Sequence, residues 1–381
     1  MPDKASPQGP RAQLLACFAA ALKAVHGQSL VHEALQGADS PGHVVAIGKA
    51  AAAMARGAQE LLGSRLSRGL LMTREGYGDE RLGATARFVC LDSDHPVPGA
   101  RSLEAGEALL RFIAETPVDE PLLFLISGGA SSLVEVLADG VSLRELQNLN
   151  QSLLAGGLDI AAMNAQRKAI SRIKGGGLNH YLGERRARVL LLSDVPGDDP
   201  AVIGSGLLAA SARVQLQIVG NNLSAQQAAA AAGQAQGLSV HVHPQALAGD
   251  AVLQAKAIVE EMKIAPAGLH IWGGETHVCL PQHPGLGGRN QHLALAAAIA
   301  LQGDASITLL AAGTDGSDGN TSVAGGMVDA GTLERGMELG GDAQKALAAA
   351  DSYRFLRASG DLVDTGPTGT NVMDVVLALK G

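Results

Sequence analysis

The residues most suited to chemistry lie in three glycine-containing turns of the C-terminal third, GGET (273–276), GGRNQ (287–291) and GTDGSDG (313–319). The first and third turns follow apolar runs that read as buried strands, and the second opens an Ala/Leu-rich helical segment. Glycine lets a ligand approach the backbone closely, and the start of a helix attracts anions. Arg289 and the two carboxylates of the third turn are suited to phosphate and to a metal ion. Together the turns predict a phosphorylated ligand.

A lysine occupies a comparable position near the N-terminus. The run His43–Gly48 reads as a strand, Lys49 comes next, and an Ala-rich helical segment follows. Proteins with α/β folds bind ligands at this position, between the carboxyl end of a strand and the start of a helix. The Gly-Lys pair does not make a P-loop, because Ala50 stands where a Ser or Thr would bind magnesium. Lys49 is therefore a candidate cation, with an ordinary surface lysine as the alternative.

A turn rich in glycine and serine follows another predicted strand. Pro121–Ile126 is a continuous apolar run, as expected for a strand buried on both faces, and it ends in SGGASS (127–132). Backbone N–H groups and Ser hydroxyls in such a turn can all donate to an anion. The candidate anion ligands are Ser127, Gly128, Gly129 and Ser131.

Four aspartates are candidates for a divalent metal site or a general base. They are Asp194, Asp198, Asp315 and Asp318. Acids that come after a strand can ligate a cation without the cost of full burial. Asp194 is the first candidate, although the sequence does not rank the four. Two other metal patterns fail, because His241 and His243 lack a third ligand and because Gly326 stands where a calcium loop starting at Asp315 needs Glu.

Composition restricts the class of protein. The chain carries a net charge of −8 and has five Phe, three Tyr and one Trp, so neither basic patches nor stacking platforms favour a nucleic-acid partner. The three cysteines are widely spaced and form no CxxC, which favours thiols in a reducing compartment. We see no signal peptide and no uncharged apolar stretch of membrane-spanning length. A cytoplasmic protein without a membrane partner is expected.

Apolar runs that alternate with helical segments predict an α/β fold, and 381 residues suggest two domains. The boundary is expected near Gly237, which gives domains of 1–237 and 238–381. One helix is expected over 11–37, and others over 142–154 and 160–173. The expected strands are 43–48, 69–73, 87–91, 121–126, 189–192, 215–219, 239–243, 269–272 and 307–312, and a final apolar segment covers 372–379.

Eight short motifs then occur in a fixed order over nearly the whole chain. They are Gly48-Lys49, SGGASS, IKGGG (173–177), SDVPGDDPAVIGSG (193–206), GGET, GGRNQ, GTDGSDG and TGPTGTNV (365–372). In this order they resemble the glycerate 2-kinase family, the class II or MOFRL-type glycerate kinases. Two positions depart from the pattern: Gly177 stands where the KGG motif often has Arg, and His292 follows GGRNQ where Glu is common. If that Arg holds phosphate in the family, another cation must replace it here.

The resemblance implies an ATP-dependent phosphorylation of D-glycerate to 2-phosphoglycerate with a divalent cation, Mg²⁺. It implies a large Rossmann-like three-layer α/β/α domain, a smaller MOFRL-type α/β domain, and an active site in the cleft between them. Lys49 and Arg289 match the family's basic positions and, with Asp194, are the expected catalytic residues. Further expected binding residues are Lys174, Gly175, Gly274, Glu275, Asn290, Thr314, Asp315, Thr368 and Asn371.

Two other classes of function stay open. Proteins of this family have also carried the label hydroxypyruvate reductase, but an NAD(P)H enzyme should show GxGxxG after a strand with an acid about twenty residues on, and no stretch here does. A non-catalytic sugar-acid or nucleotide-binding protein is less favoured, because the set of cations and carboxylates is complete; an ATP-turnover assay separates the two. The sequence does not reveal which loop binds ATP, or whether the chain forms a homodimer.

Overall fold

A computed structural model describes residues 9–37, 40–84, 87–155 and 166–381, and its contacts divide the chain into two compact units. The unit that we name the parallel unit comprises His26–Asn221 and Gly369–Asn371. The mixed unit comprises the residues up to Val25, Asn222–Thr368 and Val372–Gly381. The units are therefore not consecutive halves of the chain. The division into family domains at 1–237 and 238–381 stays a prediction.

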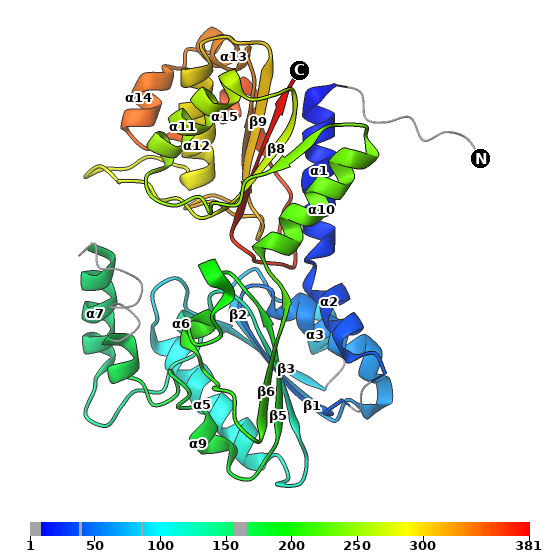
Figure 1. The fold of residues 1–381 in the computed structure, drawn as a ribbon. Helices are drawn as coiled ribbons and strands as arrows, with labels where there is room; N and C mark the ends of the chain where they lie inside the picture. Colours follow the sequence, from blue (N-terminus) through cyan, green and yellow to red (C-terminus); the bar gives the residue numbers. More distant parts are fainter. Residues whose placement is uncertain (1–8, 38–39, 85–86, 156–165) are drawn as a thin grey trace. The chain divides into compact units, whose positions relative to one another are not determined.

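The parallel unit is built on a six-stranded, wholly parallel sheet with the order β3-β2-β1-β4-β5-β6 (Figure 1). Its strands are β1 (His43–Ile47), β2 (Arg68–Arg74), β3 (Phe88–Ser93), β4 (Leu122–Ile126), β5 (Ala187–Leu192) and β6 (Val214–Gly220). Every residue of β4 is buried, as expected of a strand covered on both faces. This strand order is that of the Rossmann fold, which confirms the expected Rossmann-like architecture.

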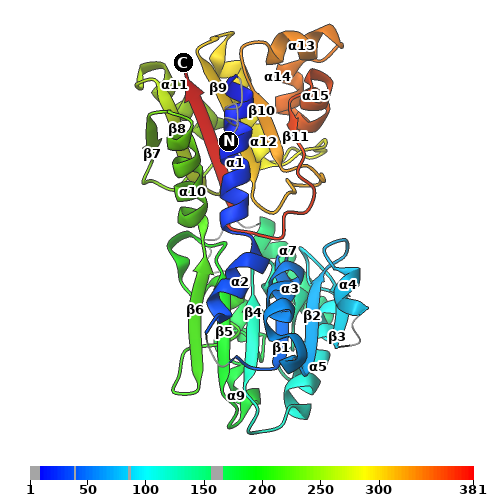
Figure 2. The ribbon, with the colours of Figure 1, turned by 90° about the vertical axis from the view of Figure 1, so that its right-hand side faces the viewer.

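Helices cover both faces of the parallel sheet (Figures 1 and 2). One face carries α2 (Gly27–Leu35) and α3 (Ala51–Leu62), and the other carries α5 (Ala100–Glu115), α6 (Ala130–Leu133) and α9 (Asn179–Leu182). The remaining described elements are α4 (Glu80–Gly83), α7 (Leu143–Ala155) and the 3₁₀ turns Gly63–Arg65, Pro196–Asp198 and Ile203–Ser205. The core under α5 joins Phe112 of that helix to Val45 and Phe124 of the central strands.

The mixed unit has a second six-stranded sheet with the order β11-β10-β9-β12-β8-β7. Its strands are β7 (Val240–Val242), β8 (Gly268–Gly274), β9 (Ile307–Gly313), β10 (Gly325–Val328), β11 (Leu362–Val363) and β12 (Asp374–Lys380). The last strand, β12, lies between β8 and β9 and runs antiparallel to both. The start of β12 is therefore beside the carboxyl ends of β8 and β9, where polar residues gather.

The sheet of the mixed unit is also covered on both faces (Figure 1). One face carries α1 (Pro10–Ala24) and α10 (Asn222–Ala235), and the other carries α11 (Ala251–Ile264) and α12 (Arg289–Leu301). The connection between β10 and β11 contains α13 (Thr332–Glu338), α14 (Ala343–Ala348) and α15 (Ser352–Ser359). Both units are thus α/β layers, as expected.

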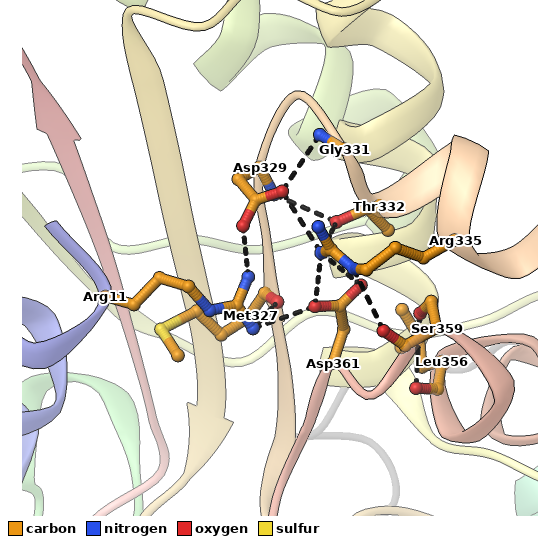
Figure 3. A network of polar contacts seen from close by, with 9 residues as sticks. All are labelled: Arg11, Met327, Asp329, Gly331, Thr332, Arg335, Leu356, Ser359 and Asp361. Carbon is orange, nitrogen blue, oxygen red and sulfur yellow. Dashed lines mark hydrogen bonds and ion pairs between the residues drawn. The ribbon is translucent and has the colours of Figure 1, made fainter.

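An ion-pair network fastens α1 to the rest of the mixed unit (Figure 3). Arg11 donates to Asp329, to Asp361 at 2.8 Å and to the carbonyl of Met327 at 3.1 Å. Arg335 donates to the same two carboxylates, at 3.1 Å and 2.7 Å. Asp361 is almost fully buried, and its charge is compensated by both Arg11 and Arg335.

The predicted strands are confirmed, with ends shifted by one or two residues, but the single helix expected over 11–37 is wrong. The segment forms α1 and α2, which meet at Val25 and His26. At that break a Cβ on Gly27 would come within 2.8 Å of Met54 Cγ, so the start of α2 is packed tightly against α3. Of the helix expected over 160–173, residues 160–165 lie outside the described part and 166–169 are helical, whereas 170–173 are not helical and Ser171 forms an isolated bridge with Leu137.

We expected no membrane-spanning stretch, yet Pro10–Leu35 is long and apolar enough to cross a membrane by length and composition. In the structure this segment is divided between α1 and α2, and Leu14, Phe18 and Val31 on it are buried against the protein. Buried core helices meet the same criterion, so the finding is weak evidence for a membrane segment.

Candidate active site

The strand order of the parallel unit reverses between β1 and β4. The chain proceeds from β1 to β2 and β3 on one side, and from β4 to β5 and β6 on the other. Ligands of open α/β sheets bind at such a switch point, outside the carboxyl ends of the strands. Ile47 pairs with Ile126, so the residues that follow, Gly48-Lys49 and SGGASS, leave the sheet side by side. The two N-terminal motifs therefore meet at the expected ligand position.

Hydrogen bonds lock these two turns together. Lys49 N donates to the Gly128 carbonyl at 2.9 Å, and Ala50 N donates to Ser127 Oγ at 3.1 Å. A Cβ on Gly48 would lie 2.2 Å from Ser127 Oγ, so only glycine allows this approach. The Ser127 side chain is fully buried and serves the start of α3. Its hydroxyl is thus a structural acceptor, whereas we expected an anion donor.

The backbone of the SGG turn offers the donors instead. Within the described residues, the N–H groups of Gly128 and Gly129 donate to no protein acceptor. Gly129 has φ +86° and immediately precedes α6, so the two consecutive N–H groups form the kind of concave nest that binds anions. Lys49, half-buried, has its side chain beside this turn: a Cβ on Gly129 would lie 3.4 Å from Lys49 Cγ.

Two further side chains from distant segments lie against the SGG turn. A Cβ on Gly128 would lie 2.0 Å from Asp194 Oδ2 and 2.1 Å from Asn371 Nδ2, and these two groups are 3.3 Å apart. A Cβ on Gly129 would lie 3.1 Å from His95 Nε2. The structure thus brings Lys49, Asp194 and Asn371 to one turn. It adds His95, which the sequence analysis missed although His95-Pro96 closely follows a predicted strand.

The neighbouring glycine motifs form a scaffold behind the turn. Ser131 Oγ lies 2.6 Å from Ser205 Oγ, and the Gly175 N–H donates to the Ser205 carbonyl at 3.0 Å. A Cβ on Gly177 would lie 2.3 Å from the Arg172 carbonyl oxygen, so this backbone conformation leaves no room for a side chain there. Ser131 and Gly175, expected to bind phosphate, are thus used in contacts between the motifs.

Lys174 is buried, in contrast to the expectation that it binds phosphate. Its side chain is 2% exposed and forms an ion pair with Glu135, which is fully buried. Glu135 also accepts from Ser171 Oγ at 2.6 Å and from Val136 N at 3.0 Å. Burial lowers the pKa of Lys174, and the Glu135 carboxylate partly offsets this effect. The pair belongs to the scaffold, and Lys49 is the lysine at the switch point.

A second polar cluster lies in the mixed unit, around Arg289 at the start of α12. Asp374 accepts from Arg289 Nε at 2.5 Å and from its NH2 group at 2.9 Å, and Glu275 lies 2.5 Å from NH1. Burial would lower the pKa of Arg289, but Asp374 and Glu275 outweigh burial and raise it. Asp374 pairs with Gly274 on β8 and Gly313 on β9. The arginine fork that we expected to hold a ligand is therefore occupied by carboxylates.

Asp318 holds the start of α12 in place. Its carboxylate accepts from the backbone N–H of Asn290 at 3.1 Å and of Gln291 at 2.8 Å, and from both side-chain amides. Burial and the charge of Asp374 raise the pKa of Asp318, the backbone donors and Arg289 lower it, and the net result is a pKa of about 6. Asp318 and Asn290 thus satisfy each other, an arrangement suited to a helix cap.

The threonines and Asp315 support the turns after β9. Thr314 Oγ1 donates to the Met373 carbonyl at 2.6 Å and accepts from Val372 N at 2.8 Å, and Thr368 donates to the Thr314 carbonyl. Asp315 Oδ1 accepts from Ser317 N at 2.9 Å. Each of these expected ligand residues has a structural partner within its own unit.

A pocket of about 450 Å³ opens beside Arg289 within the mixed unit. Apolar side chains of Val278 and Leu280 line it together with Glu275, His292 and the backbone of Gly288. His292, where the family pattern often has Glu, lies 3.1 Å from Ser352 Oγ, and burial lowers its pKa. The size and the apolar walls are typical of small-molecule sites.

The four candidate metal ligands are divided between the units. Asp194 and Asp198 belong to the parallel unit, where Asn221 Nδ2 donates to Asp198 at 2.6 Å, and Asp315 and Asp318 belong to the mixed unit. Across the described ranges, no group of three or more His, Cys, Asp or Glu side chains is arranged to hold a metal ion. Magnesium often uses only one or two carboxylates together with substrate phosphates, so the metal site stays a prediction.

Known proteins of the same architecture match nearly the whole chain. Residues 13–231 match the family described as "Domain of unknown function (DUF4147)", and residues 268–374 match the MOFRL family. The D-glycerate 2-kinase of Thermotoga maritima is 35% identical over 88% of this chain and 90% of its own length. A crystal structure of a glycerate kinase from Thermotoga maritima has a TM-score of 0.85 at 32% identity, covering 98% of this chain and 100% of that chain.

A protein of Agrobacterium vitis carries the provisional name hydroxypyruvate reductase. It is 33% identical to this chain over 89% of this chain and 99% of its own length. Both family matches, the identity to the Thermotoga enzyme and the shared fold agree with the ordered motifs. The chain is a member of the glycerate 2-kinase family.

Proposed function

We propose that this protein is a glycerate 2-kinase, which transfers the γ-phosphoryl group of ATP to the C2 hydroxyl of D-glycerate. The relationship to the D-glycerate 2-kinase of Thermotoga maritima supports the reaction. The observation that carries the proposal is the switch point, where Lys49 and two N–H donors of the SGG turn lie together. Phosphoryl transfer needs positioning and positive charge more than covalent chemistry, and this site supplies both.

In this proposal Lys49 and the SGG backbone bind a phosphate or carboxylate group. Asp194, whose carboxylate accepts a hydrogen bond from Asn371, would hold the divalent ion, because it supplies carboxylate oxygens of the kind that Mg²⁺ prefers. When bound, the ion would neutralise charge on the transferring phosphoryl group. Asp198, Asp315 and Asp318 rank below Asp194, because Asp194 lies against the SGG turn at the switch point.

In this proposal Arg289, in the second cluster, can bind a ligand anion through only one part of its guanidinium group. The Nε and NH2 groups of Arg289 each donate a hydrogen bond to the buried carboxylate of Asp374. Its NH1 group faces Glu275, whose side chain is 43% exposed. A ligand anion can therefore compete with Glu275 but not with Asp374. That both clusters serve one active site between the two units, as the family resemblance implies, stays a prediction.

A reductase is disfavoured by the turn after β1. A dinucleotide-binding protein has GxGxxG there, so that the pyrophosphate can approach the backbone. This chain has Gly48-Lys49-Ala50, and the space beside Gly48 is filled by Ser127. No observation favours a non-catalytic binding protein over the kinase.

Initial rates with purified protein test the proposal. ATP consumption should require both D-glycerate and Mg²⁺, and NAD(P)H should not be oxidised in the presence of hydroxypyruvate. Reductase activity without ATP turnover would reject the kinase, and ligand binding without either reaction would support a non-catalytic protein.

A further inference from the structure

We infer that His95 is a catalytic residue, the general base that takes the proton from the hydroxyl group being phosphorylated. This inference rests on the proposed function and adds a residue that the family motifs quoted above do not contain. It follows from the position of the imidazole ring at the SGG turn of the parallel unit.

The connection between β3 and α5 delivers His95 to the switch point. A Cβ on Gly129 would lie 3.1 Å from His95 Nε2, 3.2 Å from its Cδ2 and 3.4 Å from Lys49 Cγ. The imidazole edge and the lysine stem therefore contact the same glycine. An anionic substrate held by the N–H groups of Gly128 and Gly129 would lie within reach of both side chains.

Charged side chains lie on both sides of His95, in the sequence and at the SGG turn. Asp94, the adjacent carboxylate, is already paired with Arg101 through bonds of 3.0 Å to N and 2.9 Å to Nε. Lys49 lies on the same glycine as His95, whereas Asp194 lies on the preceding glycine, Gly128. Histidine is the side chain whose ordinary pKa, about 6.5, suits proton transfer near neutrality.

The chemical step balances with the components of the proposed reaction. The proton of the C2 hydroxyl passes to His95 Nε2 as the hydroxyl oxygen forms a bond to the γ-phosphorus of ATP. The bond from that phosphorus to the β,γ-bridging oxygen breaks, and ADP leaves with the electron pair. His95 then releases its proton to solvent. Lys49 and the SGG donors hold the charge of the transferring group, so the acid–base and charge-stabilising roles fall to different residues.

His95→Ala tests the inference, with His180→Ala as a matched control, since His180 is an exposed histidine on α9 of the same unit. Loss of a general base should lower kcat by about 10²–10⁴-fold. The KM for glycerate should change far less, and added imidazole should restore part of the rate in His95→Ala only. In His95→Gln the fall of kcat/KM at acidic pH should disappear. The control should retain the parent values.

Circular dichroism and thermal melting establish that each variant folds. A folded His95→Ala protein with kcat within a few-fold of the parent would overturn the inference and leave the kinase intact. Loss of activity without imidazole rescue, together with a parental acidic limb in His95→Gln, would make His95 structural and also overturn it. If His95→Ala does not fold, the pH profile of His95→Gln decides alone. A parent protein without glycerate-dependent ATP turnover would reject the proposed function and this inference with it.

Discussion

Lys49 and Lys174 lie at similar positions in the sequence but have opposite environments in the structure. Lys49 and Lys174 both adjoin glycine motifs of the family, and the resemblance implies that both contact the ligand. The structure leaves Lys49 half-buried beside the SGG turn and places Lys174 in a buried pair with Glu135. A cation must reach the ligand to act, so the proposed catalytic role belongs to Lys49.

Replacing each lysine should therefore damage a different property. Lys49→Ala should fold normally and lose about 10²–10³-fold in kcat, as expected for a cation that acts mainly in the transition state. Lys174→Met should lower the free energy of unfolding by roughly 3–5 kcal/mol, because Glu135 would stay buried without its partner. Steady-state kinetics and urea denaturation measure the two effects, with Lys345→Ala, an 87% exposed side chain, as control. If Lys49→Ala keeps kcat within a few-fold, Lys49 is an ordinary helix-start lysine.

Substitution of Gly128 should lower the rate of the reaction, as substitution of the charged residues should. A Cβ there would meet Asp194 Oδ2 and Asn371 Nδ2, so Gly128→Ala must displace both groups. A displacement of about 1 Å at a catalytic group can cost about 10²-fold in rate. Gly78→Ala is the control, because nothing lies near its Cβ position and its φ is not positive. Near-parental kcat in Gly128→Ala would show that the position of Asp194 does not limit the reaction.

At the scale of elements, the sequence predicted the strands well. Buried parallel strands are short apolar runs bounded by turns, and such runs, ending in glycine-containing turns, alternate with helical segments along this chain. The carboxyl ends of those strands were also the right places to seek polar residues. What the sequence could not supply was the pairing order of the strands. That order alone places β1 beside β4, and it brings His95, Asp194 and Asn371 to one turn from segments far apart in the chain.

The same limit applies to predicted ligand residues that already have partners within the protein, and their ligand roles stay predictions. Lys174, Ser127 and Asp318 have the types and neighbours of ligand residues, but each contacts another part of the protein. Sequence shows which donors and charges exist and not which of them satisfy one another. The break between α1 and α2 was missed for a related reason, because helical spacing persists through Val25 and the close packing of Gly27 on α3 is visible only in the structure.

In the network of Figure 3, α1 is represented by one side chain, Arg11. Arg11→Ala should lower the free energy of unfolding by about 1–3 kcal/mol, because Asp361 loses one of two charged donors while Arg335 remains. Lys23→Ala, an exposed position on the same helix, should change stability little. Thermal melting measures both variants. Equal melting temperatures for Arg11→Ala and the parent would show that the network contributes nothing to the docking of α1.

For the whole molecule, buried and half-buried histidines should set the response to acid. Burial lowers the pKa values of five histidines, and neighbouring charges modify this effect. They are His26, His43, His243, His270 and His292. A lowered pKa in the folded state favours the neutral ring, so the stability that these residues contribute is present above about pH 6.5 and is lost as the pH falls below it. Asp318, with a pKa raised to about 6, acts in the opposite direction.

Stability should therefore decrease between pH 7 and pH 5. His243 stacks on Trp272 with ring centroids 4.2 Å apart, so His243→Gln should flatten part of this dependence, and His180→Gln should not. Denaturation curves at a series of pH values provide the measurement. A melting temperature that rises on acidification through this range would show that the effect of Asp318, whose pKa is raised, on stability is larger than that of the histidines.

The measurement that tests the account most directly is the identity of the product. The protein is incubated with D-glycerate, ATP and Mg²⁺, and the phosphorylated carbon is identified by ³¹P and ¹³C NMR, with Lys49→Ala in parallel. We predict 2-phosphoglycerate and ADP in equal amounts, with formation slowed about 10²–10³-fold in the variant. A 3-phosphorylated product would keep the kinase and reject the 2-kinase, and no phosphorylated product, with NAD(P)H consumed on hydroxypyruvate, would contradict the account.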